Sequence, residues 1–438
     1  MWKIILAFLT LLASPISAQF FSTCSSGSDY ELERSIRAHE EHIYRLSQKF
    51  LDGYYLQRKN LPKDFAPANR DMVVRYLAQL PPARKTAVLF YAYSDQRLCT
   101  WLLAPPRAAV AHSQTIESAW FKNIDTKLKN ALGVTASEAK RAPVQRGLQS
   151  VKPDTTRTDE ATLAQTIHEF SAILLPPPIA AVLLKDSVRV LVLVPVAPLG
   201  TIPFGLLQLG GKMLIDRMSI VVAPGFFIFK AGPELSPRDF SYPIIAGNPL
   251  GWTDREWVLP ALPGARDEVL AVAGALNATA LVDSAASQKN IMAQLRKYPN
   301  AKLIYLATHG IASWANPRDA SFLLMSDGRW PAAKIQNLGL KSRPLVVLSA
   351  CQTGLGKDFD VGTIGMARAW QRAGASSIVM SLWNVDDFAT QQLMTQFIRL
   401  LPQWPVDEAL RLAMQQARAV NPHPAYWAGF SVFGAPGY

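Results

Sequence analysis

The chain has 438 residues, of which 49% are hydrophobic and 18% are charged, so it is long and apolar enough for two or three globular units. Its formal charge of +12 comes from Lys and Arg residues dispersed along the chain, and no nucleic-acid-binding motif accompanies them. We therefore expect no nucleic-acid partner. A dispersed basic surface instead favours anionic partners, such as proteins of a cell envelope.

The first residues have the features of a secretory signal. Lys3 precedes an apolar run of about ten residues, and small residues follow around Ala18. This run is short for a membrane span, and no later segment is apolar enough to cross a bilayer. We expect residues 1–18 to be a cleaved signal peptide. The protein is then exported, to the periplasm or as a secreted protein of a bacterial envelope, and has no transmembrane segment after cleavage.

Export changes how the cysteines are interpreted, because an oxidising compartment favours disulfides. The chain has cysteines at positions 24, 99 and 351, so at most one intramolecular pair can form. Pairing of Cys24 with Cys99 leaves Cys351 as a free and reactive thiol. On the count alone, Cys351 is explained equally well as a buried and inert side chain.

Two amphipathic helices are predicted ahead of the first strands. Apolar residues recur at spacings of three and four over Tyr30–Phe50, and a second helix covers Asn69–Leu80. His39 and His42 are three positions apart, whereas the histidines of a zinc-protease helix are four apart. We expect neither a metal nor another cofactor. Residues 19–84 are predicted to form a short helical lead-in.

Short apolar strands then alternate with helices to the end of the chain. Residues 105–160 are polar and basic, and we expect them to be mostly helical or looped. The predicted strands are, in chain order, "TAVLFYAYS", "RLCTWLLA", "VRVLVLVPV", "MSIVVAPG", "YPIIAGNP", "AKLIYLATHG", "SFLLMSDG", "RPLVVLSACQTG", "SSIVMSLW" and "YWAGFSVFG". The predicted helices are "DEATLAQTIHEFSAILLPP", 265–276, "GTIGMARAWQRAG", one that starts at Asp386, and 406–420.

This alternation indicates an α/β fold with a mostly parallel sheet that is covered by helices on both faces. A polar, proline-containing stretch at 232–242 separates two halves, 85–235 and 240–438. Ligands of such sheets bind at the carboxyl ends of the strands. His309, Cys351 and the pair Asp386–Asp387 each follow a strand, so we expect them to converge on one edge of the sheet.

A cysteine and a histidine at neighbouring strand ends can carry out acyl transfer. The Cys351 thiolate attacks a carbonyl carbon, and His309 protonates the leaving amine. The backbone N–H groups of Gly310 and Cys351 are the candidate donors to the oxyanion. The alternative is that Cys351 packs in the core and His309 is a satisfied buried histidine. Signature motifs of serine hydrolases, nucleotide-binding loops and thioredoxin-like proteins are absent from the sequence.

Several segments, taken in order, resemble the CHAT domain, a caspase-like family of cysteine peptidases related to separase. They are "YLATHG", "SFLLMSDG", "LVVLSACQTGLG", "ARAWQRAGASSIVMSLWNVDDFAT" and "NPHPAYWAGFSVFG". The resemblance covers roughly residues 160–438. It implies a three-layer caspase-like fold in which a half without catalytic residues, 85–235, precedes a catalytic half, 240–438. It also implies a His–Cys dyad, which matches His309 and Cys351.

In separase-like relatives, an acidic residue beyond the strand that follows the cysteine binds a basic P1 side chain. Asp387 is the better match to this acidic residue, and Asp386 is the next. The alternative is that Asp386 only caps the following helix and that Asp387 only interacts favourably with the N-terminal end of its dipole. CHAT domains often follow tetratricopeptide repeats, in place of which this chain has the helical lead-in. The resemblance predicts an exported endopeptidase that cleaves protein or peptide substrates after Arg or Lys. The alternative is a catalytically silent CHAT-fold module that binds envelope proteins.

Overall fold

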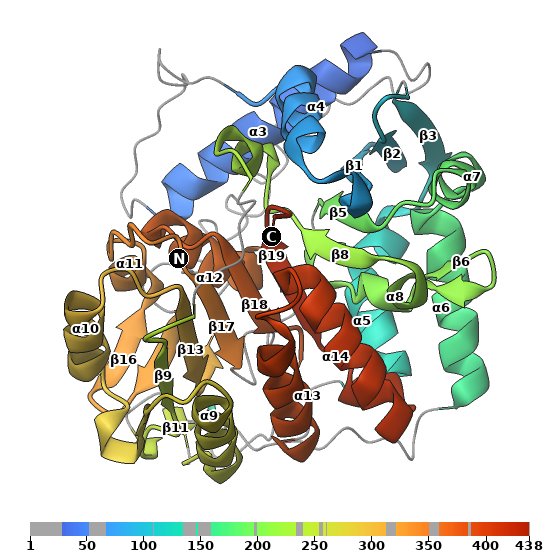
Figure 1. Cartoon of the computed structure of the whole chain (residues 1–438). Coiled ribbons are helices and arrows are strands. Elements are labelled where there is room, and N and C mark those ends of the chain that lie inside the picture. Colours follow the sequence, from blue (N-terminus) through green and yellow to red (C-terminus); the bar gives the residue numbers. More distant parts are fainter. Residues whose placement is uncertain are drawn as a thin grey trace, which may run out of the picture.

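One eleven-stranded sheet runs through both halves of the chain (Figure 1). The structure is a computed structural model, and it describes residues 29–51, 67–107, 109–134, 146–147, 159–196, 199–233, 240–253, 257–259, 261–311, 321–349, 359–383 and 387–437. The strands lie in the order β12-β9-β13-β17-β18-β19-β8-β5-β1-β2-β3. They are β1 (Thr86–Ser94), β2 (Arg97–Leu103), β3 (Val110–Thr115), β5 (Val190–Val194), β8 (Ser219–Val222), β9 (Ile244–Gly247), β12 (Ala280–Val282), β13 (Leu303–Ala307), β17 (Leu345–Ser349), β18 (Ser377–Ser381) and β19 (Phe430–Gly434).

The sheet consists of two parallel blocks that run in opposite directions. β12, β9, β13, β17 and β18 are mutually parallel, and so are β19, β8, β5 and β1. The blocks join at the antiparallel pair β18–β19, and β2 and β3 extend the far edge in antiparallel fashion. The prediction of an α/β fold with a mostly parallel sheet is confirmed.

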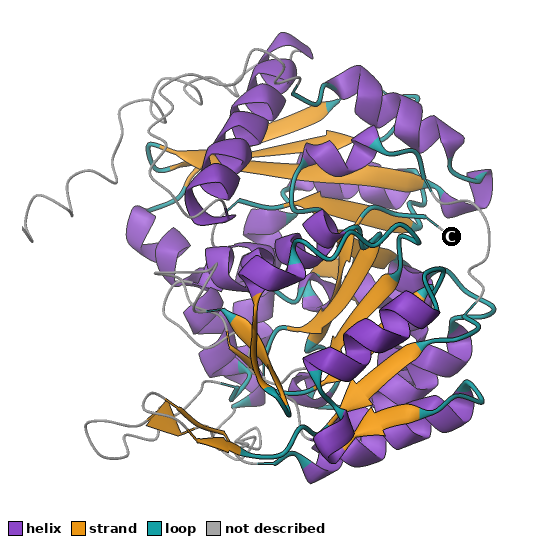
Figure 2. Ribbon diagram, turned by 90° about the vertical axis from the view of Figure 1, so that its left-hand side faces the viewer, coloured by secondary structure: helices purple, strands orange, loops and turns teal. Residues whose placement is uncertain are grey.

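Helices cover both faces of the sheet (Figure 2). They are α3 (Asp29–Leu51), α4 (Arg70–Gln79), α5 (Ser118–Ala131), α6 (Glu160–Leu174), α7 (Pro177–Lys185), α8 (Leu214–Arg217), α9 (Pro263–Ala275), α10 (Gln288–Lys297), α11 (Ala332–Ile335), α12 (Phe359–Ala373), α13 (Asp387–Leu400) and α14 (Val406–Val420). The connection through α9 crosses the sheet in one direction, whereas those through α10 and α12 cross it in the other. Because parallel crossovers are right-handed, α9 lies on one face, and α10 and α12 lie on the opposite face.

Three small sheets complete the described strands. One consists of β10 (Trp252–Thr253), β11 (Trp257–Leu259) and β4 (Arg146–Gly147), a second of β14 (Gly310–Ile311), β15 (Phe322–Met325) and β16 (Gly328–Pro331), and a third of β6 (Gln208–Leu209) and β7 (Lys212–Met213). β10 and β11 follow the carboxyl end of β9, and β14 follows the carboxyl end of β13. Two of the small sheets therefore arise at the edge where the predicted site residues lie.

Most predicted elements are confirmed, and one segment departs from the prediction. Residues 110–115, within a stretch expected to be mostly helical or looped, form the edge strand β3. Its sequence, "VAHSQT", lacks an apolar run because all its residues are at least partly exposed, so burial imposes no pattern on them. In contrast, β5 and β13 are buried along their whole length, and their apolar sequences revealed them.

The core is continuous across the two halves. It includes the fully buried indoles of Trp101, Trp370 and Trp427, and each fully buried Val or Leu side chain adds about 1.5–3 kcal/mol of stability. Polar contacts also join the halves. Arg418 of α14 forms an ion pair with Asp216 of α8, with a shortest contact of 2.5 Å.

No single helix among the described residues is long and apolar enough to cross a membrane. Of the described helices, only α6 and α7 taken together reach the length and apolar composition of a membrane span, and a bend of 88° separates the two helices.

The helical lead-in packs on the rest of the fold and shares its core. In Figure 1, α3 and α4 lie together over the ends of the strands. The His39 ring makes edge-to-face contacts with Phe90 of β1 and Phe226 of the 3-10 helix η5 (Phe226–Lys230), at 5.4 and 5.8 Å between centroids. Tyr76 of α4 donates a 2.5 Å hydrogen bond to the carbonyl oxygen of Pro436 near the C-terminus. His39 is thus part of an aromatic cluster.

A buried carboxyl group connects α3 to η5. Glu40 is 4% exposed, and the Phe226 N–H donates to its Oε1 at 2.8 Å. Burial raises the pKa of Glu40 above its ordinary value of 4.5, although backbone N–H donors and the charge of Lys230 act in the opposite direction. The neutral carboxyl is therefore favoured in the folded protein over the unfolded chain.

This shift predicts a pH-dependent stability. A group whose folded pKa is raised contributes stability below its unfolded pKa, and that contribution is lost as the pH rises through the folded pKa. We expect the wild-type protein to lose melting temperature relative to Glu40→Gln as the pH is raised from about 4 to about 7. Thermal melts of both proteins across this range test the prediction, and a constant difference between them would contradict it.

Candidate active site

Four parallel strand ends form the edge at which the predicted residues converge. β13 pairs in register with β9 and with β17, so Ala307 lies between Gly247 on one side and Ser349 on the other. β17 pairs in turn with β18, where Leu348 lies beside Met380. The carboxyl ends of β9, β13, β17 and β18 therefore share one edge, which is where sheets of this kind bind ligands.

His309 lies at this edge, two residues beyond the end of β13. Its side chain is buried, with 3% of its surface exposed. The neighbouring strand β15 holds the backbone here, because the Leu324 N–H donates to the His309 carbonyl oxygen at 2.8 Å. The Thr308 hydroxyl donates in turn to the Leu324 carbonyl oxygen. These two bonds hold the histidine backbone at the corner between β13 and β14.

Gly310 is the first residue of β14 and lies opposite Leu323 of β15. The hydrogen bond between His309 and Leu324 belongs to the neighbouring pair, and hydrogen-bonded and non-hydrogen-bonded pairs alternate along an antiparallel ladder. The Gly310–Leu323 pair is thus of the non-hydrogen-bonded kind, whose backbone groups point away from the partner strand. The Gly310 N–H is therefore directed away from β15.

Two of the predicted residues lie outside the described part of the chain. Cys351 follows Ser349, the last residue of β17, by two positions, and Asp386 precedes α13. Asp387 is the first residue of α13, but its side chain is not among those described. The structure thus brings His309 beside the strand that leads to Cys351, and it brings the strand before the two aspartates to the same edge.

The segment that follows β18 is anchored by the C-terminal part of the chain. The Leu382 N–H donates to the Gly429 carbonyl oxygen at 2.6 Å. The Trp383 indole N–H donates at 3.0 Å to the carbonyl oxygen of Ala425, in the 3-10 helix η7 (Pro424–Tyr426). Both donors precede Asp386–Asp387 by a few residues. The closing motif "NPHPAYWAGF" therefore holds Leu382 and Trp383, which precede the two aspartates in the chain.

Sequence reasoning missed three buried polar side chains just below the edge. Tyr305 of β13 is fully buried, Glu268 of α9 is 3% exposed and Ser349 of β17 is 5% exposed. The Tyr305 hydroxyl donates to Glu268 Oε1 at 2.5 Å and is also hydrogen-bonded to Ser349. The signal in the sequence was a tyrosine inside the otherwise aliphatic strand "LIYLA", since a buried hydroxyl needs partners.

Cys99, one of the two cysteines predicted to pair, lies on β2. It is 3% exposed and disulfide-bonded. Cys24, its predicted partner, precedes the first residue that the structure describes. Cys99 is therefore not a free thiol.

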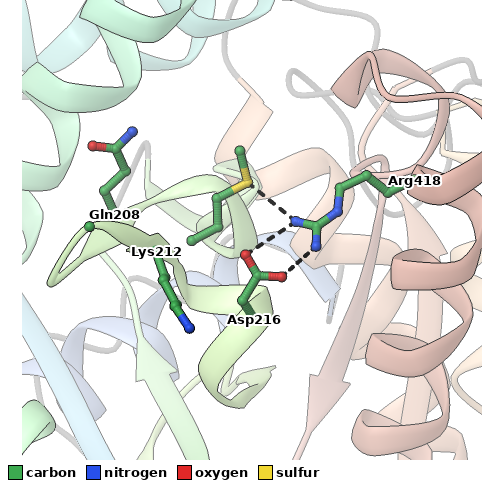
Figure 3. Close-up of a pocket in the computed structure, with 6 residues that line it drawn as sticks. Gln208, Lys212, Asp216 and Arg418 are labelled. Atoms are coloured by element: carbon green, nitrogen blue, oxygen red, sulfur yellow. Dashed lines mark hydrogen bonds and ion pairs between the residues drawn. The ribbon is translucent and has the colours of Figure 1, made fainter.

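A pocket with a volume of about 520 Å³ is formed by residues other than the predicted ones (Figure 3). It is lined by Gln208, Gly211, Lys212, Met213, Asp216 and Arg418. Figure 3 shows the Arg418 guanidinium facing the Asp216 carboxylate, with the shorter of their contacts at 2.5 Å. These two charges satisfy each other, and the pocket shares no residue with the edge that carries His309.

Residues 163–435, which are more than half of the chain, match the family model of the CHAT domain. Tetratricopeptide repeat protein 28 of Homo sapiens is 26% identical over 302 residues, which are 56% of this chain and 12% of that protein. The protein of the same name from Mus musculus is 27% identical over 306 residues, with the same coverage. The chain thus spans about an eighth of the length of these relatives.

Solved structures of two cysteine-peptidase systems are also similar. The Saccharomyces cerevisiae separase–securin complex aligns with 94% of this chain and 34% of that chain, with 11% identity and a TM-score of 0.49. The Arg-specific cysteine proteinase gingipain R aligns with 64% of this chain and 68% of that chain, with 12% identity and a TM-score of 0.40. These values are too low to transfer an activity, a substrate or a partner.

Proposed function

Because the chain belongs to the CHAT domain family, we propose that it is a cysteine endopeptidase with Cys351 as nucleophile and His309 as general acid and base. One observation carries the proposal: Ala307 and Ser349 are register partners, and His309 and Cys351 each follow two residues later. Neighbouring strands are about 4.8 Å apart, and both residues are the same two steps along the chain from a register pair. This supports an imidazole and a thiol within reach of each other.

The reaction is acyl transfer in two steps. His309 takes the thiol proton, and the Cys351 sulfur attacks the scissile carbonyl carbon. The C–N bond then breaks, the amine leaves with the proton from His309, and a thioester joins the acyl group to the enzyme. In the second step His309 takes a proton from water, and the hydroxide attacks the thioester. The acid is released, and the thiol is restored.

The oxyanion of each tetrahedral intermediate is stabilised by the Gly310 and Cys351 N–H groups in this proposal. Support comes from the orientation of the Gly310 N–H, which points away from β15 and is not used by that ladder. A donor that is oriented before the reaction costs no reorganisation when negative charge develops. Glycine also lets the substrate backbone approach closely, because it has no Cβ.

Asp387, with Asp386 as the second candidate, binds the Arg or Lys side chain on the amino side of the cleaved bond. The support is topological: β18 ends at the same edge as β13 and β17, and α13 begins with Asp387. A carboxylate at this position binds a guanidinium or ammonium group by a charge-assisted hydrogen bond. An acid at the first position of a helix also interacts favourably with the helix dipole, so the two roles are compatible.

The enzyme works outside the cytoplasm in this proposal, in the periplasm or as a secreted protein, where it meets protein or peptide substrates and envelope proteins. The support is the signal-like N-terminus together with the disulfide at Cys99. A fusion of residues 1–30 to a reporter that is active only after export tests the location. Loss of reporter activity when the apolar run is interrupted is the expected control result, and an inactive intact fusion would contradict export.

Cys24 is the partner of Cys99 in this proposal. β2 and β17, the strand that leads to Cys351, are six strand spacings of about 4.8 Å apart, whereas a disulfide needs Cα atoms within about 7 Å. We expect a non-reducing peptide map to show a Cys24–Cys99 cross-link, and an alkylating reagent to modify Cys351 alone. A cross-link that contains Cys351 would contradict this prediction.

Active-site labelling tests the proposed function directly. A peptidyl electrophile with Arg at P1 is expected to modify Cys351 of the reduced, purified protein, as read by mass spectrometry. Probes with Asp or Leu at P1, and the Cys351→Ala variant, serve as controls and are expected to show no labelling. If folded wild-type protein is not labelled by the Arg probe and cleaves no member of a positional scanning library, the endopeptidase proposal fails. The alternative from the sequence, a silent interaction module, then stands.

A further inference from the structure

Three polar side chains connect a helix to the two strands of the candidate dyad. Tyr305 lies in β13, four residues before His309, and Ser349 lies in β17, two residues before Cys351. Since Ala307 and Ser349 are register partners, Tyr305 and Ser349 are diagonal neighbours on one face of the sheet. Glu268 reaches this face from α9 and accepts the Tyr305 hydroxyl at 2.5 Å.

The hydrogen bonds that connect Ser349, Tyr305 and Glu268 have a defined direction. The Tyr305 proton is given to Glu268, so the Tyr305 oxygen accepts from the Ser349 hydroxyl. Burial, and then the nearby Glu268 charge, raise the pKa of Tyr305 well above its ordinary value. Tyr305 therefore stays protonated and acts as a permanent donor to Glu268. The Ser349 hydroxyl proton is in turn directed toward Tyr305.

The position of α9 is itself closely determined. A Cβ on Gly247 of β9 would come within 2.6 Å of a Val269 methyl group, so glycine at this position lets α9 approach the sheet. Asn248 then holds the start of the helix, because its Oδ1 accepts the Leu262 N–H at 2.6 Å. The Asn248 N–H is bonded to the Ala307 carbonyl oxygen at 3.0 Å. Glu268 is thus presented to Tyr305 by a helix that is tied to the end of β13.

We propose that Glu268, Tyr305 and Ser349 are positioning residues that set the alignment of His309 with Cys351 by tying the ends of β13 and β17 to α9. The inference rests on the proposed function, because it concerns how the dyad is aligned. α13, which begins with Asp387, packs against the same helix. The helix α9 therefore contacts both the strands of the dyad and the helix α13, which carries the candidate pocket residue. Catalytic groups need such support, since small misplacements are costly.

The test compares two variants that make the same chemical change. Tyr305→Phe removes the hydroxyl that connects Ser349 to Glu268 and keeps the aromatic ring. Tyr91→Phe is the matched control, because Tyr91 is also fully buried on a strand and donates to the Leu174 carbonyl oxygen at 2.8 Å, but in the other half. Both variants are expected to lower the melting temperature. Only Tyr305→Phe is expected to lower kcat for an Arg-P1 peptide, by about 10- to 100-fold, with little change in KM.

Two further variants keep the proposal falsifiable. Ser349→Ala leaves the Tyr305–Glu268 bond in place, and we expect it to lower kcat in the same direction even if Tyr305→Phe fails to fold. Glu268→Gln retains an acceptor oxygen for Tyr305, so we expect it to keep kcat close to the wild-type value. If Tyr305→Phe and Ser349→Ala match Tyr91→Phe in both melting temperature and kcat, the three residues are only structural and the proposal is overturned.

A second readout separates this inference from the endopeptidase proposal. The rate at which iodoacetamide alkylates Cys351 follows the thiolate fraction, which depends on an aligned imidazole. We expect the pH midpoint of alkylation to move to higher pH in Tyr305→Phe and to stay unchanged in Tyr91→Phe. This shift supports the positioning role even in a protein that cleaves no peptide, and equal midpoints in all variants overturn it. If the wild type cleaves peptides but all variants share the same pH midpoint of alkylation, the endopeptidase proposal is supported and the positioning role is not.

Discussion

Replacing His309 with alanine is expected to lower kcat/KM for an Arg-P1 peptide by about 10²- to 10⁴-fold, because a positioned general acid and base supplies a factor of this size. This corresponds to about 3–5 kcal/mol of transition-state stabilisation. Cys351→Ala is expected to abolish turnover, since no nucleophile remains to form the thioester. Steady-state assays of both purified variants, with melting temperatures as a check on folding, measure these effects.

The double variant gives the sharper result. If the two side chains act as one unit, His309→Ala together with Cys351→Ala should be no less active than Cys351→Ala alone. His112 of β3 is a matched control, because it lies on the far edge strand of the other half. His112→Ala is expected to leave kcat/KM unchanged. Residual turnover in Cys351→Ala that a further His309→Ala change removes would show that the peptidase reaction uses another nucleophile.

Removing one member of a buried ion pair in the N-terminal half, 85–235, is expected to cause the largest loss of stability. Lys129 Nζ lies 3.0 Å from Asp125 Oδ2 on α5, and each side chain is only 6% exposed. The Thr201 hydroxyl also donates to Asp125, at 2.9 Å. Lys129→Met leaves the Asp125 carboxylate buried without its nearby cation. We expect the free energy of unfolding to fall by about 3–5 kcal/mol, measured by denaturant titration.

The exposed pair Arg37–Glu41 is the matched control, since it has the same spacing on a helix and a 3.1 Å contact, but its arginine is 67% exposed. Arg37→Ala is expected to change the free energy of unfolding by less than about 1 kcal/mol. Combining Lys129→Met with Asp125→Leu should restore part of the loss, because no unpaired buried charge remains. A Lys129→Met variant as stable as the wild type would contradict the prediction.

Local patterns in the sequence determined most of the elements. The helix 406–420 was predicted with the bounds that the structure shows, because its apolar residues repeat with the helical period. The buried strands β5, β13 and β17 were recognisable from their unbroken apolar runs. The placement of His309 just beyond a parallel strand followed from the same pattern, since the carboxyl ends of such strands are readable along the chain.

Only the tertiary structure decided which segments become neighbours. The edge strand β3 escaped detection because partial exposure leaves its sequence without an apolar pattern. Glu40 and Phe226 are 186 residues apart and meet only because α3 packs on η5. Glu268 and Tyr305 are 37 residues apart, and no periodicity relates a helix residue to a strand residue across that distance.

The candidate site is divided in the same way. Residue types and spacing along the chain named His309, Cys351 and the two aspartates, because each follows a strand. The register that pairs Ala307 with Ser349, and the buried hydrogen bonds beneath them, were set by packing between α9 and the sheet. The residue types that can carry out the reaction are recognisable in the sequence. Their alignment depends on contacts between segments that are distant in the sequence.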